Sequence, residues 1–256
     1  VKVTDAQLSA HLTVDGGGDD DVLEVQDDTS IVDADLAGLA GIETLRLVAD
    51  AVDNGQSVVL GAEAAAAGIT TIAAGAVGVD DAVSVDASAF ANGLAITTGA
   101  GNDVIVLGTG GSQVTSGNGA DSVTLGAATD VVASGAGNDT LVVDAVTIGA
   151  AIDGGANTGA GDLLQIVGGG TAVMGASVVN VERVQLVTAT DFTANATSAL
   201  DITGSTGNDR ITVGAGDQVV DAGGGDDTIA VTDALLSNGL VLEGGAATSG
   251  DTLEIT

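Results

Sequence analysis

The chain has 256 residues, with 36 acidic side chains against four basic ones, a formal net charge of −32, and no proline, cysteine, tryptophan or tyrosine. This composition excludes disulfides and thiolate metal sites, makes nucleic acid a poor partner, and argues against insertion into anionic membranes. High net charge favours disorder, but 45% of the residues are hydrophobic, and disordered chains are poor in such residues. We therefore expect thin, repetitive β-structure in which something neutralises the carboxylates.

The first 97 residues contain one glycine- and aspartate-rich unit, "DGGGDDDVL" at 15–23, with Gly18 and Asp20 at its fourth and sixth positions. "GAEAAAAGI" at 61–69 predicts a short helix, because alanine is the best helix former. The alternation in "GIETLRLV" at 41–48 indicates a strand with Glu43 facing solvent or a basic group. Four other acidic residues here fit a solvated face: Asp27, Asp28, Asp33 and Asp35.

Residues 98–142 form five consecutive nonapeptides, "TGAGNDVIV", "LGTGGSQVT", "SGNGADSVT", "LGAATDVVA" and "SGAGNDTLV". Position 8 of every unit is aliphatic, and position 6 is aspartate in all but one, where Ser112 replaces it. A fixed short period is the mark of a repeat architecture. The glycines at positions 2 and 4 permit tight turns, and positions 7 to 9 form a short strand with position 8 pointing inward.

Two such units make one coil of 18 residues, and parallel coils stack about 4.8 Å apart. Odd units then share one edge, where Asp103, Asp121 and Asp139 lie above one another. Unpaired carboxylates at that separation would repel strongly. A hard divalent cation held by carboxylate and carbonyl oxygens would convert the repulsion into attraction.

Residues 204–230 repeat the pattern as "GSTGNDRIT", "VGAGDQVVD" and "AGGGDDTIA", with Gln218 at position 6 of the middle unit. Two longer segments, 3–25 and 231–255, align with each other, and 143–166 is a further copy. In these copies Asp162 and Asp251 would occupy cation loops with a small insertion. Glu182 in "NVERVQLV" corresponds to Glu43. "DALLSNGL" predicts one helical turn with Asp233 as its N-cap.

The nonapeptides resemble the calcium-binding repeat of the RTX family, G-G-x-G-x-D-x-U-x, which forms a parallel β-helix. The resemblance implies an all-β parallel β-solenoid, a β-roll, with degenerate coils and short helical excursions. We expect degenerate solenoid over 1–97 and 143–203, regular β-roll over 98–142 and 204–230, and the start of another repeat over 231–256, all within one segment of a longer chain. The resemblance implies several calcium ions, held by Gly99, Gly101, Asp103, Gly117, Gly119, Asp121, Gly135, Gly137, Asp139, Asp130, Gly207, Asp209, Gly225, Asp227, Gly18 and Asp20.

No zinc helix, nucleophile elbow or phosphate loop occurs in the sequence, so we expect no enzyme activity. The resemblance implies a structural segment of a secreted protein at the bacterial cell surface, exported by type I secretion and folding on calcium. We favour self-assembly with copies of itself, as a surface layer or filament, with cell-surface polysaccharide as a second partner. The alternatives are a monomeric adhesin spacer, the accessory β-roll of a secreted enzyme, and an ice-binding module. The ice-binding module needs an unbroken Thr/Asn ladder, which positions 3 and 5 interrupt at Ala100, Ala120 and Ala136.

Overall fold

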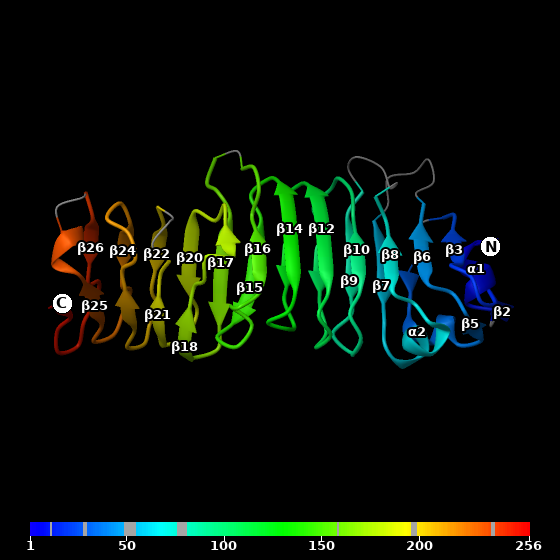
Figure 1. Cartoon of the computed structure of the whole chain (residues 1–256), viewed down its shortest axis with the longest axis horizontal. Coiled ribbons are helices and arrows are strands. Elements are labelled where there is room, and N and C mark those ends of the chain that lie inside the picture. The colour runs from blue at the N-terminus through cyan, green and yellow to red at the C-terminus, as the bar shows by residue number, and fades with distance from the viewer. Residues whose placement is uncertain are drawn as a thin grey trace. The chain divides into compact units, whose positions relative to one another are not determined.

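A computed structural model of the chain describes residues 1–10, 12–27, 30–48, 55–75, 81–157, 159–195, 199–236 and 239–256. The fold is an all-β parallel β-solenoid, which confirms the fold class predicted from the nonapeptides. The chain divides into two compact units, Val1–Gly137 and Asn138–Thr256. Within each unit, successive coils place their strands side by side (Figure 1).

The first unit is built from two parallel sheets and one separate strand pair. One sheet contains, in order, β1 (Lys2–Val3), β3 (Val22–Val25), β6 (Thr44–Leu47), β8 (Thr71–Ala73), β10 (Ala95–Thr97), β12 (Gln113–Asn118) and β14 (Val131–Ala136). The other contains β4 (Ser30–Ile31), β7 (Gln56–Val59), β9 (Val83–Asp86), β11 (Val104–Val106) and β13 (Ser122–Thr124). The separate pair is β2 (Val14–Asp15) and β5 (Leu39–Ala40).

The second unit repeats this arrangement. One sheet contains β15 (Thr140–Asp144), β17 (Leu163–Val167), β20 (Arg183–Leu186), β22 (Asp201–Thr203), β24 (Val219–Asp221) and β26 (Val241–Glu243). The opposite sheet contains β18 (Gly170–Val173), β21 (Thr190–Thr193), β23 (Arg210–Thr212), β25 (Thr228–Val231) and β27 (Thr252–Ile255). β16 (Ala151–Asp153) pairs with β19 (Val178–Val179).

The strand register follows the coil length that the sequence predicts. In the nonapeptide runs, residues facing each other on neighbouring coils are 18 apart, as in Val104↔Ser122 and Arg210↔Thr228. Odd and even units lie in different sheets, as the two-unit coil requires. Outside these runs the coils continue with insertions, so that Thr44 pairs with Thr71 and Thr140 with Leu163.

The core consists of alternate strand residues that point between the sheets. The position-8 side chains are buried as predicted at Ile105, Val114, Val123, Val132, Leu141, Ile211, Val220 and Ile229. The prediction was wrong at 15–23, where Val22 is half-buried and Leu23 is fully buried. The true unit therefore begins one residue later, at Gly16, and Asp21 rather than Asp20 takes position 6.

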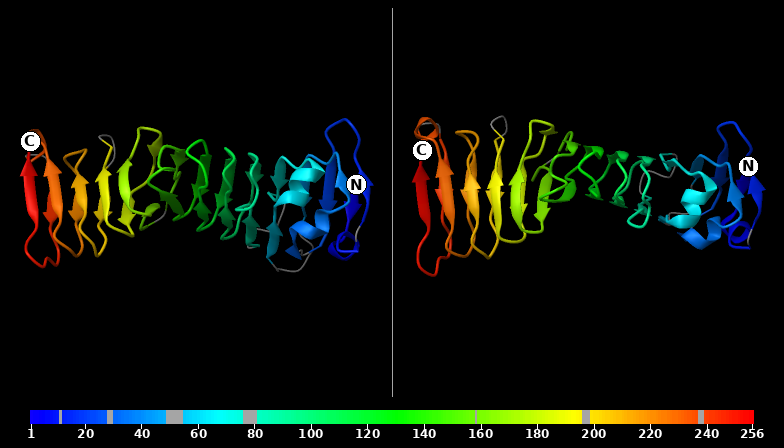
Figure 2. Two further views of the ribbon diagram at one scale, coloured as in Figure 1. Left: turned by 90° about the horizontal axis from the view of Figure 1, so that it is seen from below. Right: turned by 60° about the horizontal axis from the view of Figure 1, so that its bottom comes forward.

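Short helical turns leave the coils at a few corners (Figures 1 and 2). They are α1 (Asp5–Leu8), the 3-10 turn η1 (Asp33–Leu36), α2 (Ala62–Ala67) and the 3-10 turn η2 (Asp233–Leu235). α2 confirms the helix predicted from its alanines, and it ends at Gly68 in the left-handed conformation. η2 confirms the predicted turn, but its N-cap is Thr232 rather than Asp233. Among the described residues, no helix is long and apolar enough to cross a membrane.

Asp33 does not belong to a solvated face, contrary to the prediction. Its carboxylate oxygens accept hydrogen bonds from the amides of Gly61 at 2.8 Å, Ala64 at 2.9 Å and Glu63 at 3.1 Å. These amides lie at the N-terminus of α2, where negative charge is favourable. Asp33 therefore caps a helix from a different coil. Asp28 lies outside the described residues.

Candidate metal centre

The aspartates at position 6 bond to the coil that precedes their own. Asp121 Oδ1 accepts the amide of Asp103 at 2.8 Å, and Asp227 Oδ1 accepts the amide of Asp209 at 2.7 Å. Asp130 Oδ1 likewise accepts the amide of Ser112 at 2.8 Å. These contacts confirm the predicted neighbours within each unit. One oxygen of each carboxylate thus fixes the register between two coils.

In some of the glycine-rich loops the second carboxylate oxygen has no hydrogen-bond partner among the described residues. Asp103 and Asp227 are buried, and their Oδ2 atoms have no hydrogen-bond partner among the described residues. Burial raises the pKa of Asp103, which the nearby Thr98 hydroxyl and Gly99 amide only partly offset. Burial also raises the pKa of Asp227, reinforced by the charge of Asp209. Buried carboxylates of this kind are costly unless something neutralises them.

In two loops that lack one of the repeat glycines, groups of the same loop donate hydrogen bonds to the second carboxylate oxygen of the position-6 aspartate. Asp130 Oδ2 accepts the amides of Gly126 at 3.0 Å and Ala127 at 2.8 Å. Asp209 Oδ2 accepts both the amide of Ser205 at 2.7 Å and its hydroxyl at 2.8 Å. Position 4 is alanine in the first loop, and position 2 is Ser205 in the second. The position-6 aspartates are therefore not equivalent, although the motif predicts metal ligation at both.

The glycines bring the backbones of successive loops into close contact. Gly119 has φ +132°, and a Cβ there would overlap the carbonyl oxygen of Gly101 in the preceding coil. Gly117, Gly135, Gly137 and Gly225 are left-handed as well. Gly99, Gly207 and Gly18 do not use this conformation. A need for positive φ therefore accounts for glycine at only some of the predicted positions.

The asparagine of "GND" has a role that the sequence analysis missed. Asn102 Oδ1 accepts the amide of Ala120 at 2.7 Å, and Asn208 Oδ1 accepts the amide of Asp226 at 3.0 Å. Each acceptor bonds to position 5 of the following coil, whereas the neighbouring aspartate bonds to the preceding one. The adjacent Asn and Asp of the motif were the signal for this role.

In three units of the first run, a hydroxyl side chain stands at position 1, where the family pattern has its first glycine. Thr98 donates its hydroxyl to the carbonyl of Ser116 at 2.8 Å, and Ser116 donates to the carbonyl of Ser134 at 2.9 Å. All three side chains are buried. A hydroxyl ladder therefore joins the coils beside the metal loops.

Two glutamates, one in each unit, also supply position-6 carboxylates, contrary to the prediction that they face solvent or a basic group. Glu43 Oε2 accepts the amide of Asp21, and Glu182 Oε2 accepts the amide of Asp162, both at 2.8 Å. Each occupies position 6 of its coil. Asp139 and Asp162 follow one another in the same column of position-6 carboxylates, because the amide of Asp139 donates to Asp162 Oδ1 at 2.8 Å.

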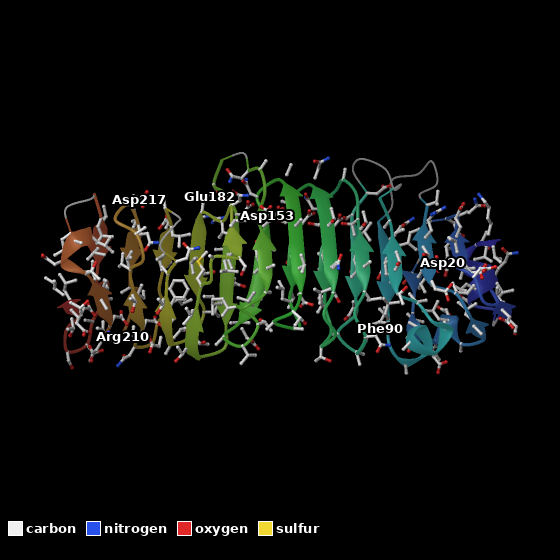
Figure 3. The ribbon with its side chains drawn as sticks, viewed as in Figure 1. Asp20, Phe90, Asp153, Glu182, Arg210 and Asp217 are labelled. Carbon is white, nitrogen blue, oxygen red and sulfur yellow. The ribbon has the colours of Figure 1, made fainter. Side chains whose placement is uncertain are left out.

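Figure 3 shows Glu182 and Asp217, which precedes Gln218, on one edge of the second unit, and Arg210 on the other.

The donors at these loops are oxygens of carboxylates and of the backbone, the set that calcium prefers. No group of three or more acidic or histidine side chains among the described residues could hold a metal alone. Carbonyl oxygens must therefore supply much of any coordination shell. The described ion pairs, Lys2–Glu24, Arg46–Glu24 and Arg210–Glu254, involve no position-6 carboxylate. The loops therefore fit calcium better than a basic side chain as their neutralising group.

Calcium-free protein is expected to gain β-structure when the pH is lowered. Burial, with the charges of Asp139 and Glu182, raises the pKa of Asp162 to about 6, and the pKa values of Asp103 and Asp227 are also raised. The folded chain then binds protons more tightly than the unfolded chain, so stability increases as pH falls from about 7 towards about 4. Circular dichroism in chelator at the two ends of this range measures the effect. A decrease in β-signal at about pH 5 would contradict it.

Comparison with known families identifies the repeats. The model of the RTX calcium-binding nonapeptide repeat matches residues 96–114, 107–141 and 201–229. The matches cover the two predicted nonapeptide runs and leave the unit near residue 20 outside. Searches of curated proteins and of solved structures found no match. Residues 96–141 and 201–229 are therefore RTX calcium-binding repeats folded as a β-roll, and calcium is the ion that such repeats bind.

Proposed function

Starting from these RTX repeats, we propose that the chain is a calcium-dependent structural segment of a secreted bacterial surface protein that assembles with copies of itself. RTX repeats occur in secreted proteins, and the β-roll is a structural rather than a catalytic fold. The observation that carries the proposal is the presence in each unit of buried position-6 carboxylates whose second oxygen has no hydrogen-bond partner among the described residues, as at Asp103 and Asp227. Such carboxylates favour the folded state where calcium is abundant, because metal binding contributes directly to folding.

Self-assembly is supported by the last coil of the second unit. Leu253 and Ile255 are 52% and 54% exposed, whereas the corresponding residues of the aligned copy, Leu23 and Val25, are fully buried beneath the next coil. β27 also leaves one edge without a strand among the described residues. A further parallel coil, from the same chain or from another copy, would cover these side chains and pair with the edge of β27.

Light scattering during a calcium titration tests the assembly. The wild-type chain is expected to grow from monomers to large particles at millimolar calcium. A variant with Leu253→Asp and Ile255→Asp should bind calcium normally but lose at least about tenfold in association, since each buried charge costs more than 1.4 kcal/mol. Val104→Asp with Val131→Asp is the matched control, because these side chains are also about half exposed, each at 48%, but lie on the outer faces of inner coils.

A monomeric spacer is the main alternative role. A wild-type particle that compacts on calcium and stays monomeric would favour the spacer. Equal association of both variants would also contradict assembly through the coil end. Neither result would affect calcium binding by the repeats.

A further inference from the structure

The loop between Asp153 and Asp162 lies outside the segments that match the RTX repeat. The carboxylate column nevertheless passes through it. Asp162 is fully buried, its Oδ1 accepts the amide of Asp139, and its own amide donates to Glu182 Oε2. These contacts persist although the coils here are 23 and 20 residues long instead of 18. The insertion therefore changes the loop without displacing its central acid.

Asp162 Oδ2 is buried and has no hydrogen-bond partner among the described residues. It lies against Gly154, where a Cβ would be 2.7 Å from this oxygen and would overlap the carbonyl oxygen of Asn180. Only glycine allows both oxygens to approach this point. Two oxygens of different coils thus face one small space beside Gly154.

The backbone at Asn180 supports this arrangement. Asn180 has φ 53° and is the one non-glycine residue of the described chain with positive φ. Its Nδ2 donates to Asp153 Oδ1 at 2.7 Å, which holds the turn. Figure 3 shows Asp153 and Glu182 on the same edge of the unit. The carbonyl of Asn180 is thereby fixed where it meets the acid of the loop.

Burial raises the pKa of Asp162 and the charge of the nearby Arg183 lowers it, but Arg183 forms no direct ion pair with either acid among the described residues. Arg183 Nη2 donates to the carbonyl of Gly161 at 2.9 Å. The ion pairs of the described residues include neither Asp162 nor Glu182. Two carboxylates, one of them fully buried, therefore remain beside oxygen donors without a direct ion pair among the described residues.

We propose that this loop is a calcium site of a second type, in which Asp162, Glu182 and the main-chain carbonyl of Asn180 supply oxygens. The site deepens the proposed function, on which it rests, and differs from the nonapeptide loops in its glutamate and in having an asparagine rather than a glycine as its left-handed carbonyl donor. Hard divalent cations bind such oxygen sets. A family pattern built on nine-residue spacing does not detect it.

The copy near the N-terminus repeats the same features. Gly41 has φ 59° and corresponds to Asn180, and a Cβ at Gly16 would overlap the Gly41 carbonyl oxygen. Asp21 donates its amide to Glu43 Oε2, and its Oδ2 is buried without a hydrogen-bond partner among the described residues. Recurrence in two separate coils indicates a defined loop type.

The test compares the full-length chain with Asp162→Asn. Calcium per chain is counted by equilibrium dialysis, and thermal unfolding is measured in calcium and in chelator. The variant is expected to bind one calcium fewer, to unfold at lower temperature in calcium, and to unfold at higher temperature in chelator, because the uncompensated charge is gone. Asp201→Asn, an exposed residue that removes the same charge, is the matched control and should retain the wild-type calcium count.

An unchanged calcium count in Asp162→Asn would overturn the site while leaving the proposed function intact. A lower unfolding temperature both with and without calcium would assign Asp162 a purely structural role and would also overturn it. A wild-type chain that binds no calcium would overturn both. Glu182→Gln, which keeps an acceptor for the Asp162 amide, replaces the variant if Asp162→Asn does not fold, and the same outcomes apply.

Discussion

Removal of calcium is expected to abolish most of the parallel β-signal and to expand the chain. An occupied site contributes about 2.7 kcal/mol when free calcium is a hundredfold above Kd. A few sites together therefore match the roughly 5–15 kcal/mol that stabilises an ordinary domain. Without the ion, the buried acids at Asp103, Asp162 and Asp227 oppose folding together with the net charge of −32. Circular dichroism and small-angle scattering in chelator measure the two effects.

Magnesium and sodium chloride at matched ionic strength are the controls for this experiment. Simple screening weakens repulsion among exposed charges in any salt. Magnesium demands near-octahedral geometry and keeps its waters, so it should bind poorly in loops rich in carbonyl donors. We therefore expect magnesium to refold the chain much less than calcium does. A complete β-signal in chelator, or equal recovery in sodium chloride, would refute a structural role for calcium.

Gly119→Ala is expected to be among the most damaging single substitutions. The new Cβ would overlap the Gly101 carbonyl oxygen, and φ +132° is a conformation that alanine avoids. Backbone strain alone costs about 1–3 kcal/mol, and the overlap would also push two loops apart. We expect Tm in calcium to fall by at least about 5 °C, with weaker calcium binding at the Asp103 and Asp121 loops.

Gly18→Ala provides the matched control for this substitution. Gly18 does not have a left-handed φ, and nothing lies within 4 Å of a Cβ built there. Its effect on Tm should stay within about 2 °C, as for an ordinary surface change. Equal destabilisation by both substitutions would show that coil contact at Gly119 is not the cause. Differential scanning calorimetry of the two variants decides the matter.

Sequence periodicity predicted the fold because each coil repeats the same local chemistry. The inward residues from Ile105 to Leu141 follow strict nine-residue spacing, so their burial could be predicted from the sequence. The unit at 15–23 was placed one residue too early, because three consecutive aspartates, Asp19 to Asp21, satisfy the pattern in more than one frame. The burial of Leu23 and its pairing with Leu45 resolve that ambiguity.

Contacts between coils of unequal length were beyond the reach of sequence. Glu182 reaches the amide of Asp162, 20 residues earlier, and Asp33 caps a helix about 30 residues away. Neither spacing belongs to the repeat, and a glutamate in an alternating strand normally faces water. The sequence also did not reveal that the second carboxylate oxygen lacks a hydrogen-bond partner at Asp103 but has one at Asp209. This difference depends on which loop amides reach that oxygen.

One carboxylate oxygen of the position-6 acids described above accepts a backbone amide of the preceding coil in each such contact that the structure records, from Asp103 to Asp227. A break between two such coils would therefore leave an amide donor on one face and a carboxylate acceptor on the other. These faces are chemically complementary but not alike. Because these hydrogen bonds point one way, each carboxylate meets its amide donor only where coils stack head to tail. The position-6 side chain of each coil thus sets the direction in which the coils stack.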